Sequence, residues 1–117
     1  MPHRKFILFF YTFVIPAKAG IQFNINRMNI NKLMKIIRDR KLKMPKESYV
    51  ASLFKAGQDR IIQKVGEEAT EVIIAAKNKN KKRIISEVAD LLFHLLILLI
   101  YAGISFSNIE EELEKRN

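Results

Sequence analysis

Five carboxylates that could act together lie between residues 67 and 90. Glu67, Glu68 and Glu71 form an E-E-x-x-E string, and after 15 further residues Glu87 and Asp90 form an E-x-x-D string. In a helix, spacings of three and four residues place side chains on one face. Carboxylates that face one another repel strongly unless cations balance them, and hard divalent cations with oxygen ligands do this. The spacing therefore predicts a divalent-metal site, and Mg²⁺ suits polyphosphate chemistry particularly well.

Two helices are expected to carry these strings. The first begins near Asp59 and ends at about Lys77, and the second runs from about Arg83 to Tyr101. The polar residues 78–82 predict a short turn, which makes the helices antiparallel neighbours and lets the two strings converge. On the first helix the helical period predicts an apolar face made of Ile61, Ile62, Val65, Ala69, Val72, Ile73 and Ala76.

The remaining segments also predict helices. Asn29 or Asn31 caps a helix that ends at Met44-Pro45, and residues 48–54 form a short helical turn before a break at Gly57. Ser105 or Ser107 caps a last helix, while Ser48 and Asp59 are interpreted as helix caps rather than catalytic groups. No segment alternates with period two for long enough to be a strand. The expected class is all-α, an antiparallel bundle of four to five helices per chain.

Residues 91–100 are apolar almost all round, so their helix must be covered on every side. Its stretch of about 12 strongly apolar positions is expected to fall short of a membrane span. A chain of 117 residues has too few other helices to bury that surface. We therefore expect a homodimer with this helix at its core, and no membrane partner.

The charges are distributed unevenly along the chain. Its net charge is +9, yet residues 1–66 carry 14 Lys/Arg against 3 Asp/Glu, whereas residues 67–117 carry 7 against 9. A basic half beside an acidic cluster suits a polyphosphate substrate. The interleaved aromatics of a base-stacking platform are missing, so no nucleic-acid partner is expected. The absence of cysteine excludes disulfides and Cys-ligated zinc, and it agrees with a reducing cytoplasm.

Residues 1–27 differ from the rest of the chain. A basic string, an apolar run over residues 6–15 and the sequence Ala17-Lys18-Ala19 together have the three regions of a secretory signal peptide. Residues 14–22, however, resemble a peptide that is produced when dispersed bacterial repeat DNA is translated. Met28 then stands directly before a well-patterned helix. We interpret residues 1–27 as an extension outside the fold, signal-like or spurious, with a signal or anchor and a packed element as alternatives. Residues 28–117 are the expected domain, and export is disfavoured against a cytoplasmic location.

Longer strings carry a family resemblance. The carboxylate pattern resembles the all-α nucleoside triphosphate pyrophosphatases of MazG type. The strings at 48–54, 57, 59–61, 64–72 and 87–96 resemble the phosphoribosyl-ATP pyrophosphatase family of histidine biosynthesis, and the resemblance covers roughly 28–116. It implies Mg²⁺-dependent hydrolysis of 1-(5-phosphoribosyl)-ATP to 1-(5-phosphoribosyl)-AMP and pyrophosphate, the second step of that pathway. The cyclohydrolase often fused to this domain uses cysteine-ligated zinc, so a chain without cysteine is expected to be the stand-alone form.

The resemblance also implies roles for single residues. Glu68, Glu71, Glu87 and Asp90 are expected to bind one or more Mg²⁺ ions, with Mn²⁺ as a substitute. The expected catalytic residues are Glu67, Glu68 and Lys64. Glu67 is assigned as a partner of the metal ligands or as the general base. Lys64 is assigned either to a phosphate or to an i,i+4 ion pair with Glu68.

Weaker predictions concern the substrate and a histidine. Arg38, Lys55, Lys77 and Tyr49 are weak candidates for substrate contacts, against solvated cations and a core tyrosine as alternatives. His94, on an apolar helix, is interpreted as a hydrogen-bonded core residue rather than a base.

Two other functions remain open at this point. A MazG-type pyrophosphatase of ordinary or non-canonical (d)NTPs would use the same carboxylates and differ in its substrate contacts. A non-catalytic helical dimerisation module, secreted or anchored, would require no Mg²⁺.

Overall fold

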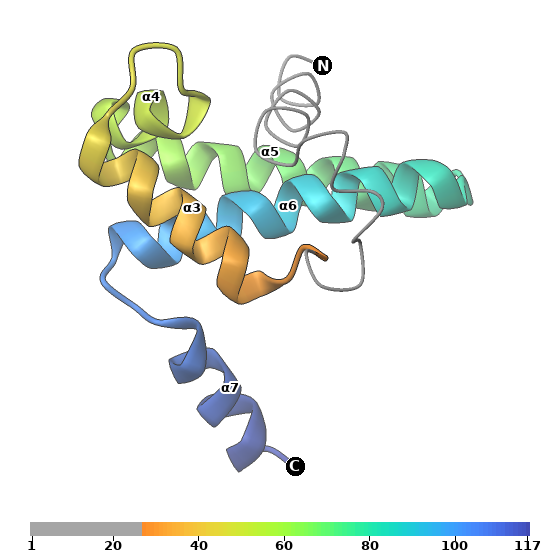
Figure 1. Ribbon diagram of the computed structural model, residues 1–117. Coiled ribbons are helices and arrows are strands. Elements are labelled where there is room, and N and C mark those ends of the chain that lie inside the picture. Colours follow the sequence, from red (N-terminus) through yellow and green to blue (C-terminus); the bar gives the residue numbers. More distant parts are fainter. Residues whose placement is uncertain (1–26) are drawn as a thin grey trace.

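The computed structural model describes residues 27–117, so the interpretation of residues 1–26 lies outside the described part. Five helices follow one another: α3 (Ile30–Lys43), α4 (Tyr49–Ala56), α5 (Gln58–Lys77), α6 (Lys81–Tyr101) and α7 (Phe106–Lys115) (Figure 1). Residues 27–117 contain no strand, and the predicted all-α class is confirmed.

Side-chain caps fix where four of these helices begin. The side-chain oxygens of Asn29, Ser48, Asn80 and Ser105 accept hydrogen bonds from backbone N–H groups in the first turns of α3, α4, α6 and α7. The prediction that Asp59 caps a helix was wrong. Gly57 precedes α5 without a side-chain cap, and Asp59 lies inside the first turn. Gly57 has a φ of +100°, a backbone conformation that residues other than glycine rarely adopt. This residue therefore both ends α4 and begins α5.

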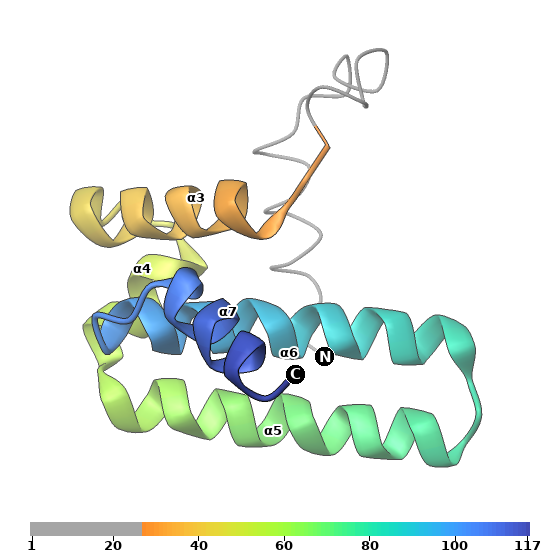
Figure 2. The ribbon, with the colours of Figure 1, turned by 90° about the horizontal axis from the view of Figure 1, so that it is seen from below.

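Helices α5 and α6 form an antiparallel hairpin, joined by a short turn at residues 78–80 (Figure 2). Figure 2 also shows α3 along the other side of α6, and Figure 1 shows α7 extending away from the bundle beyond the end of α6. The convergence of the two carboxylate strings required this hairpin. The hairpin therefore decides which side chains can meet at the site.

The hydrophobic core lies where α3, α4, the beginning of α5 and the C-terminal half of α6 meet. Its buried members are Met34, Ile37, Val50, Leu53, Ile61, Phe93, Leu96, Ile97 and Ile100. Burying a leucine, isoleucine or phenylalanine side chain stabilises a fold by about 1.5–3 kcal/mol. This core therefore anchors the C-terminal half of α6 and leaves the N-terminal half to carry the acids.

The predicted apolar face of α5 was wrong. Of its seven residues only Ile61 is buried, and Ile62 and Ile73 are 47% and 61% exposed. The buried residues of α5 are Ile61, Lys64, Glu68 and Ala75, which follow one another at helical spacing along a face that adjoins the predicted one and shares Ile61 with it. The helix turns this partly charged face towards α6, and Ile62, Ile73 and Ile74 are left exposed.

The hairpin consequently exposes apolar side chains on both of its helices. The exposed ones are Ile62, Ile73 and Ile74 on α5, and Ile85, Val88, Leu92 and Leu95 on α6. The expectation that one chain cannot cover its own apolar surface agrees with these exposures.

By length and composition α6 could cross a membrane, since it has 21 residues and a window of mean hydropathy 2.1. The expectation that its apolar stretch is too short for a span was wrong. Core helices of soluble proteins meet the same criterion. In this chain Phe93, Leu96, Ile97 and Ile100 of α6 belong to the core, and 39% of the window is buried.

Candidate active site

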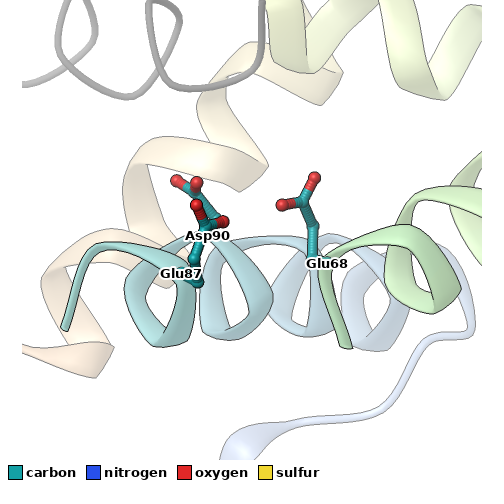
Figure 3. Close-up of side chains that lie close together, drawn as sticks. All are labelled: Glu68, Glu87 and Asp90. Carbon is teal, nitrogen blue, oxygen red and sulfur yellow. The ribbon is translucent and has the colours of Figure 1, made fainter. Parts of the chain in front are cut away.

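Three carboxylates from the hairpin gather at one place. Glu68 of α5 and Glu87 and Asp90 of α6 each offer an oxygen, and these oxygens lie within 4.8 Å of one another. The three side chains project to the same side of the hairpin (Figure 3). All three residues are buried, with exposed fractions of 0%, 0% and 1%.

The geometry of this group suits a small divalent cation. Mg²⁺ holds oxygen ligands at about 2.0–2.1 Å, so two of its ligands lie at most about 4.2 Å apart. Oxygens within 4.8 Å of one another need to move only slightly to reach one shared cation. The donor set is also the hard-oxygen set that Mg²⁺ and Mn²⁺ prefer.

The fourth predicted ligand, Glu71, is not part of this group of three. Its side chain is 20% exposed, and its Oε2 lies 3.4 Å from Nη2 of Arg83. The same nitrogen lies 3.3 Å from Oε1 of Glu87, one turn further along α6. The assignment of Glu71 as a metal ligand therefore stays a prediction, and Arg83 is a member of the site that sequence reasoning missed.

Lys64 lies on the buried face of α5 beside the acids. Its Nζ is 3.3 Å from Oε2 of Glu68 and 3.7 Å from Oε1 of Glu67. Glu67 also lies 3.8 Å from Arg60. The i,i+4 ion pair with Glu68 that was one interpretation of Lys64 is present. Its alternative role as a phosphate contact stays a prediction, as does the role of Glu67 as general base.

Burial changes the proton affinity of Glu68. It raises the pKa of this carboxyl from 4.5 to about 7, and the ion pair with Lys64 opposes the rise only in part. The nearby charges of Asp90 and Glu87 raise this pKa further. Near neutral pH a cation that binds Glu68 must therefore compete with a proton.

Tyr49 and His94 connect α4 to this part of α6. Nδ1 of His94 lies 2.7 Å from the backbone oxygen of Asp90, which can only accept, so Nδ1 carries a proton. In the neutral ring Nε2 is then an acceptor, and the Tyr49 hydroxyl, 2.8 Å away, donates to it. Burial raises the pKa of Tyr49, which keeps this donor protonated. The interpretation of His94 as a hydrogen-bonded core residue is confirmed, since it is completely buried.

The other weak candidates are distributed over the surface. Arg38 of α3, Lys55 of α4 and Lys77 at the end of α5 are all exposed. Tyr49 is half-buried, and its ring lies 6.5 Å from that of Phe93. Substrate contacts by these four residues stay predictions.

A helical bundle whose central hairpin gathers three buried carboxylates has the arrangement of an all-α, metal-dependent protein. Residues 30–117 match the family model described as phosphoribosyl-ATP pyrophosphohydrolase. The chain belongs to this family, and the resemblance stated from the sequence is confirmed.

Proteins named for this family are close relatives. The phosphoribosyl-ATP pyrophosphatase of Leptospira biflexa is 56% identical over 86 residues, which cover 74% of this chain and 94% of the relative. The phosphoribosyl-ATP pyrophosphatase of Clostridium botulinum is 48% identical over 93 residues, or 79% of this chain and 84% of the relative. The histidine biosynthesis bifunctional protein HisIE of Caldanaerobacter subterraneus is 43% identical over 108 residues, which are 92% of this chain but 50% of that protein.

Proposed function

We propose that this chain hydrolyses 1-(5-phosphoribosyl)-ATP to 1-(5-phosphoribosyl)-AMP and pyrophosphate in histidine biosynthesis. The names of relatives up to 56% identical supply the substrate. The observation that carries the chemistry is the group of three buried carboxylates, Glu68, Glu87 and Asp90. Water cleaves the bond between the α and β phosphates. Pyrophosphate therefore leaves, and the α phosphate stays with the nucleoside.

Mg²⁺ is the cofactor that this group suits, with Mn²⁺ as a substitute. Glu68, Glu87 and Asp90 would hold it, and Glu71 is close enough along α5 to be a further ligand. A cation bound there would neutralise phosphate oxygens and lower the pKa of a water molecule. Because the three carboxylates are buried, their charge acts on the cation with little screening by solvent.

The remaining charged residues would orient the ligands and the water. Lys64 is buried and ion-paired with Glu68, which supports an orienting role for it over a direct contact with phosphate. Glu67 is 40% exposed at its side chain, next in sequence to a proposed ligand. A carboxylate that is both accessible and adjacent to the site can accept a proton from the attacking water, and this supports Glu67 as the general base.

The exposed apolar side chains of the hairpin support a homodimer. Ile73 and Ile85 are 61% and 72% exposed, and further apolar side chains of both helices are exposed beside them in the sequence. A second copy that covers this surface would remove it from water. We place the dimer in the cytoplasm, with a small-molecule substrate and neither a nucleic acid nor a membrane as partner.

Turnover of phosphoribosyl-ATP with Mg²⁺ and with EDTA tests the proposal. We expect hydrolysis in Mg²⁺ only, and a loss of at least about a hundredfold in Glu68→Gln and Asp90→Asn, because each removes one charged ligand. Glu112→Gln, at an exposed acid of α7, is the control and should retain activity. Undiminished turnover in the two site variants would contradict the metal assignment. Hydrolysis of dNTPs without hydrolysis of phosphoribosyl-ATP would favour the MazG-type alternative, and activity in EDTA would exclude the cofactor.

A further inference from the structure

Arg83 occupies an unusual position among the cations of the site. A single nitrogen, Nη2, is shared between Oε2 of Glu71 at 3.4 Å and Oε1 of Glu87 at 3.3 Å. Strong pairs between arginine and carboxylate are shorter, about 2.7–2.9 Å, and often use two parallel hydrogen bonds. The contact of Arg83 therefore provides charge without the geometry of a tight clamp.

The arginine also has hydrogen-bonding capacity to spare. Its Nε is buried and has no hydrogen-bond partner within residues 27–117. A guanidinium has five N–H donors, arranged in a planar fork that suits phosphate. The side chain of Arg83 is 41% exposed, so it can turn away from the acids without unpacking the core.

The charges of the site show what Arg83 contributes. Five acids, Glu67, Glu68, Glu71, Glu87 and Asp90, are accompanied in the described part of the chain by ion pairs from Arg60, Lys64 and Arg83. Arg60 and Lys64 lie beside Glu67 and Glu68. Within residues 27–117, Arg83 is thus the cation that forms ion pairs with Glu71 and Glu87.

We propose that Arg83 is a displaceable counter-cation. It neutralises Glu71 and Glu87 until a divalent cation takes their charge, and it then turns outwards to bind a phosphate of the substrate. A divalent cation and the guanidinium repel each other and draw on the same carboxylates, so the two compete. After this exchange Glu71 is able to bind the metal, and the Arg83 guanidinium is able to bind the leaving pyrophosphate. This inference rests on the proposed function, because it requires a divalent cation at the carboxylates.

Metal binding without substrate tests the first half. Mn²⁺ is titrated into the full chain by calorimetry or electron paramagnetic resonance, for the wild type, Arg83→Gln, Arg83→Lys and Lys82→Gln. Removing a unit charge that competes for the same carboxylates is expected to tighten Mn²⁺ binding about tenfold in Arg83→Gln. Arg83→Lys keeps the charge and should bind within about twofold of the wild type. Lys82→Gln removes the same charge from the neighbouring exposed position and should also stay within about twofold.

Pyrophosphate binding tests the second half. With saturating Mg²⁺, Arg83→Gln is expected to bind inorganic pyrophosphate about tenfold more weakly than the wild type. If Arg83→Gln binds Mn²⁺ no more tightly than the wild type or Lys82→Gln, Arg83 does not compete with the divalent cation. Unchanged pyrophosphate affinity overturns the release towards phosphate.

The wild-type titration separates this inference from the proposed function. A wild-type chain that binds no divalent cation would end both. A wild-type chain that binds the metal and turns over phosphoribosyl-ATP, beside an Arg83→Gln variant with wild-type affinities, would end the role of Arg83 alone.

Discussion

The buried carboxyl of Glu68 is expected to make the metal-free chain less stable as the pH rises. Its pKa in the folded chain is raised from 4.5 to about 7, chiefly because burial penalises the charged form. Between these two values the folded chain holds a proton that the unfolded chain has lost. The unfolding free energy therefore falls with pH across this window. The part of the unfolding free energy that comes from the protonated Glu68 is fully present below pH 4.5 and is lost once the pH exceeds about 7.

The size of this effect follows from the two pKa values. The difference between 4.5 and about 7 corresponds to about 3 kcal/mol of unfolding free energy. Other groups also titrate in this range, so the variant Glu68→Gln isolates the contribution, because its amide does not titrate. We expect the unfolding free energy of the wild type, relative to Glu68→Gln, to fall by about 3 kcal/mol between pH 4 and pH 8. Urea denaturation in EDTA, followed by circular dichroism, measures it.

Two comparisons make this experiment decisive. Glu112→Gln changes an acid that is 52% exposed and paired with Arg116, so its difference from the wild type should stay within about 0.5 kcal/mol at every pH. Added Mg²⁺ should flatten the decline of the wild type, since it binds the ionised carboxylate of the folded chain. A difference between wild type and Glu68→Gln that does not change from pH 4 to pH 8 would refute the reasoning about burial.

Three further outcomes follow from the structure. Tyr49→Phe removes the hydrogen bond to His94 and should lower the unfolding free energy by about 1 kcal/mol in urea denaturation, and an unchanged midpoint would show that this bond is not stabilising. Ile85→Asp places a charge on the exposed apolar surface and should shift sedimentation velocity profiles from dimer to monomer, whereas an unaltered profile would place the interface elsewhere. Asn80→Ala removes the side-chain oxygen that accepts a hydrogen bond from the backbone N–H of Arg83, and it should lower the unfolding free energy by about 1 kcal/mol. Asn80→Asp retains the cap and serves as the control.

The class of fold and the meeting of the acids were predictable because both depend on local spacing. Apolar residues at helical intervals, a polar turn and two acid strings at i,i+3 or i,i+4 define a hairpin before any long-range contact is known. The structure brings Glu68, Glu87 and Asp90 together as the strings require. The caps at Asn29, Ser48 and Ser105 are equally local, since each side chain binds its own helix.

What could not be predicted depends on partners distant in sequence. Helix α5 has both apolar and charged side chains at helical spacing, and its own sequence does not show that the face with Lys64 and Glu68 is the buried one. Arg83 looks like one more cation of a lysine-rich turn until Glu71, 12 positions earlier, is placed opposite it. The hydrogen bond between Tyr49 and His94 joins residues 45 positions apart, and no periodicity reports such a contact.

The hairpin also has a consequence for the order in which the chain folds. Contacts between residues close in sequence form soonest, because closing a short loop costs little entropy, and α5 and α6 are joined by only a short turn. Yet this is the pair of helices whose facing side chains include Glu68, Glu87 and Asp90. We therefore expect charge repulsion to oppose the step that chain connectivity favours most. We also expect the cofactor proposed for the reaction to speed refolding, because it would relieve this repulsion.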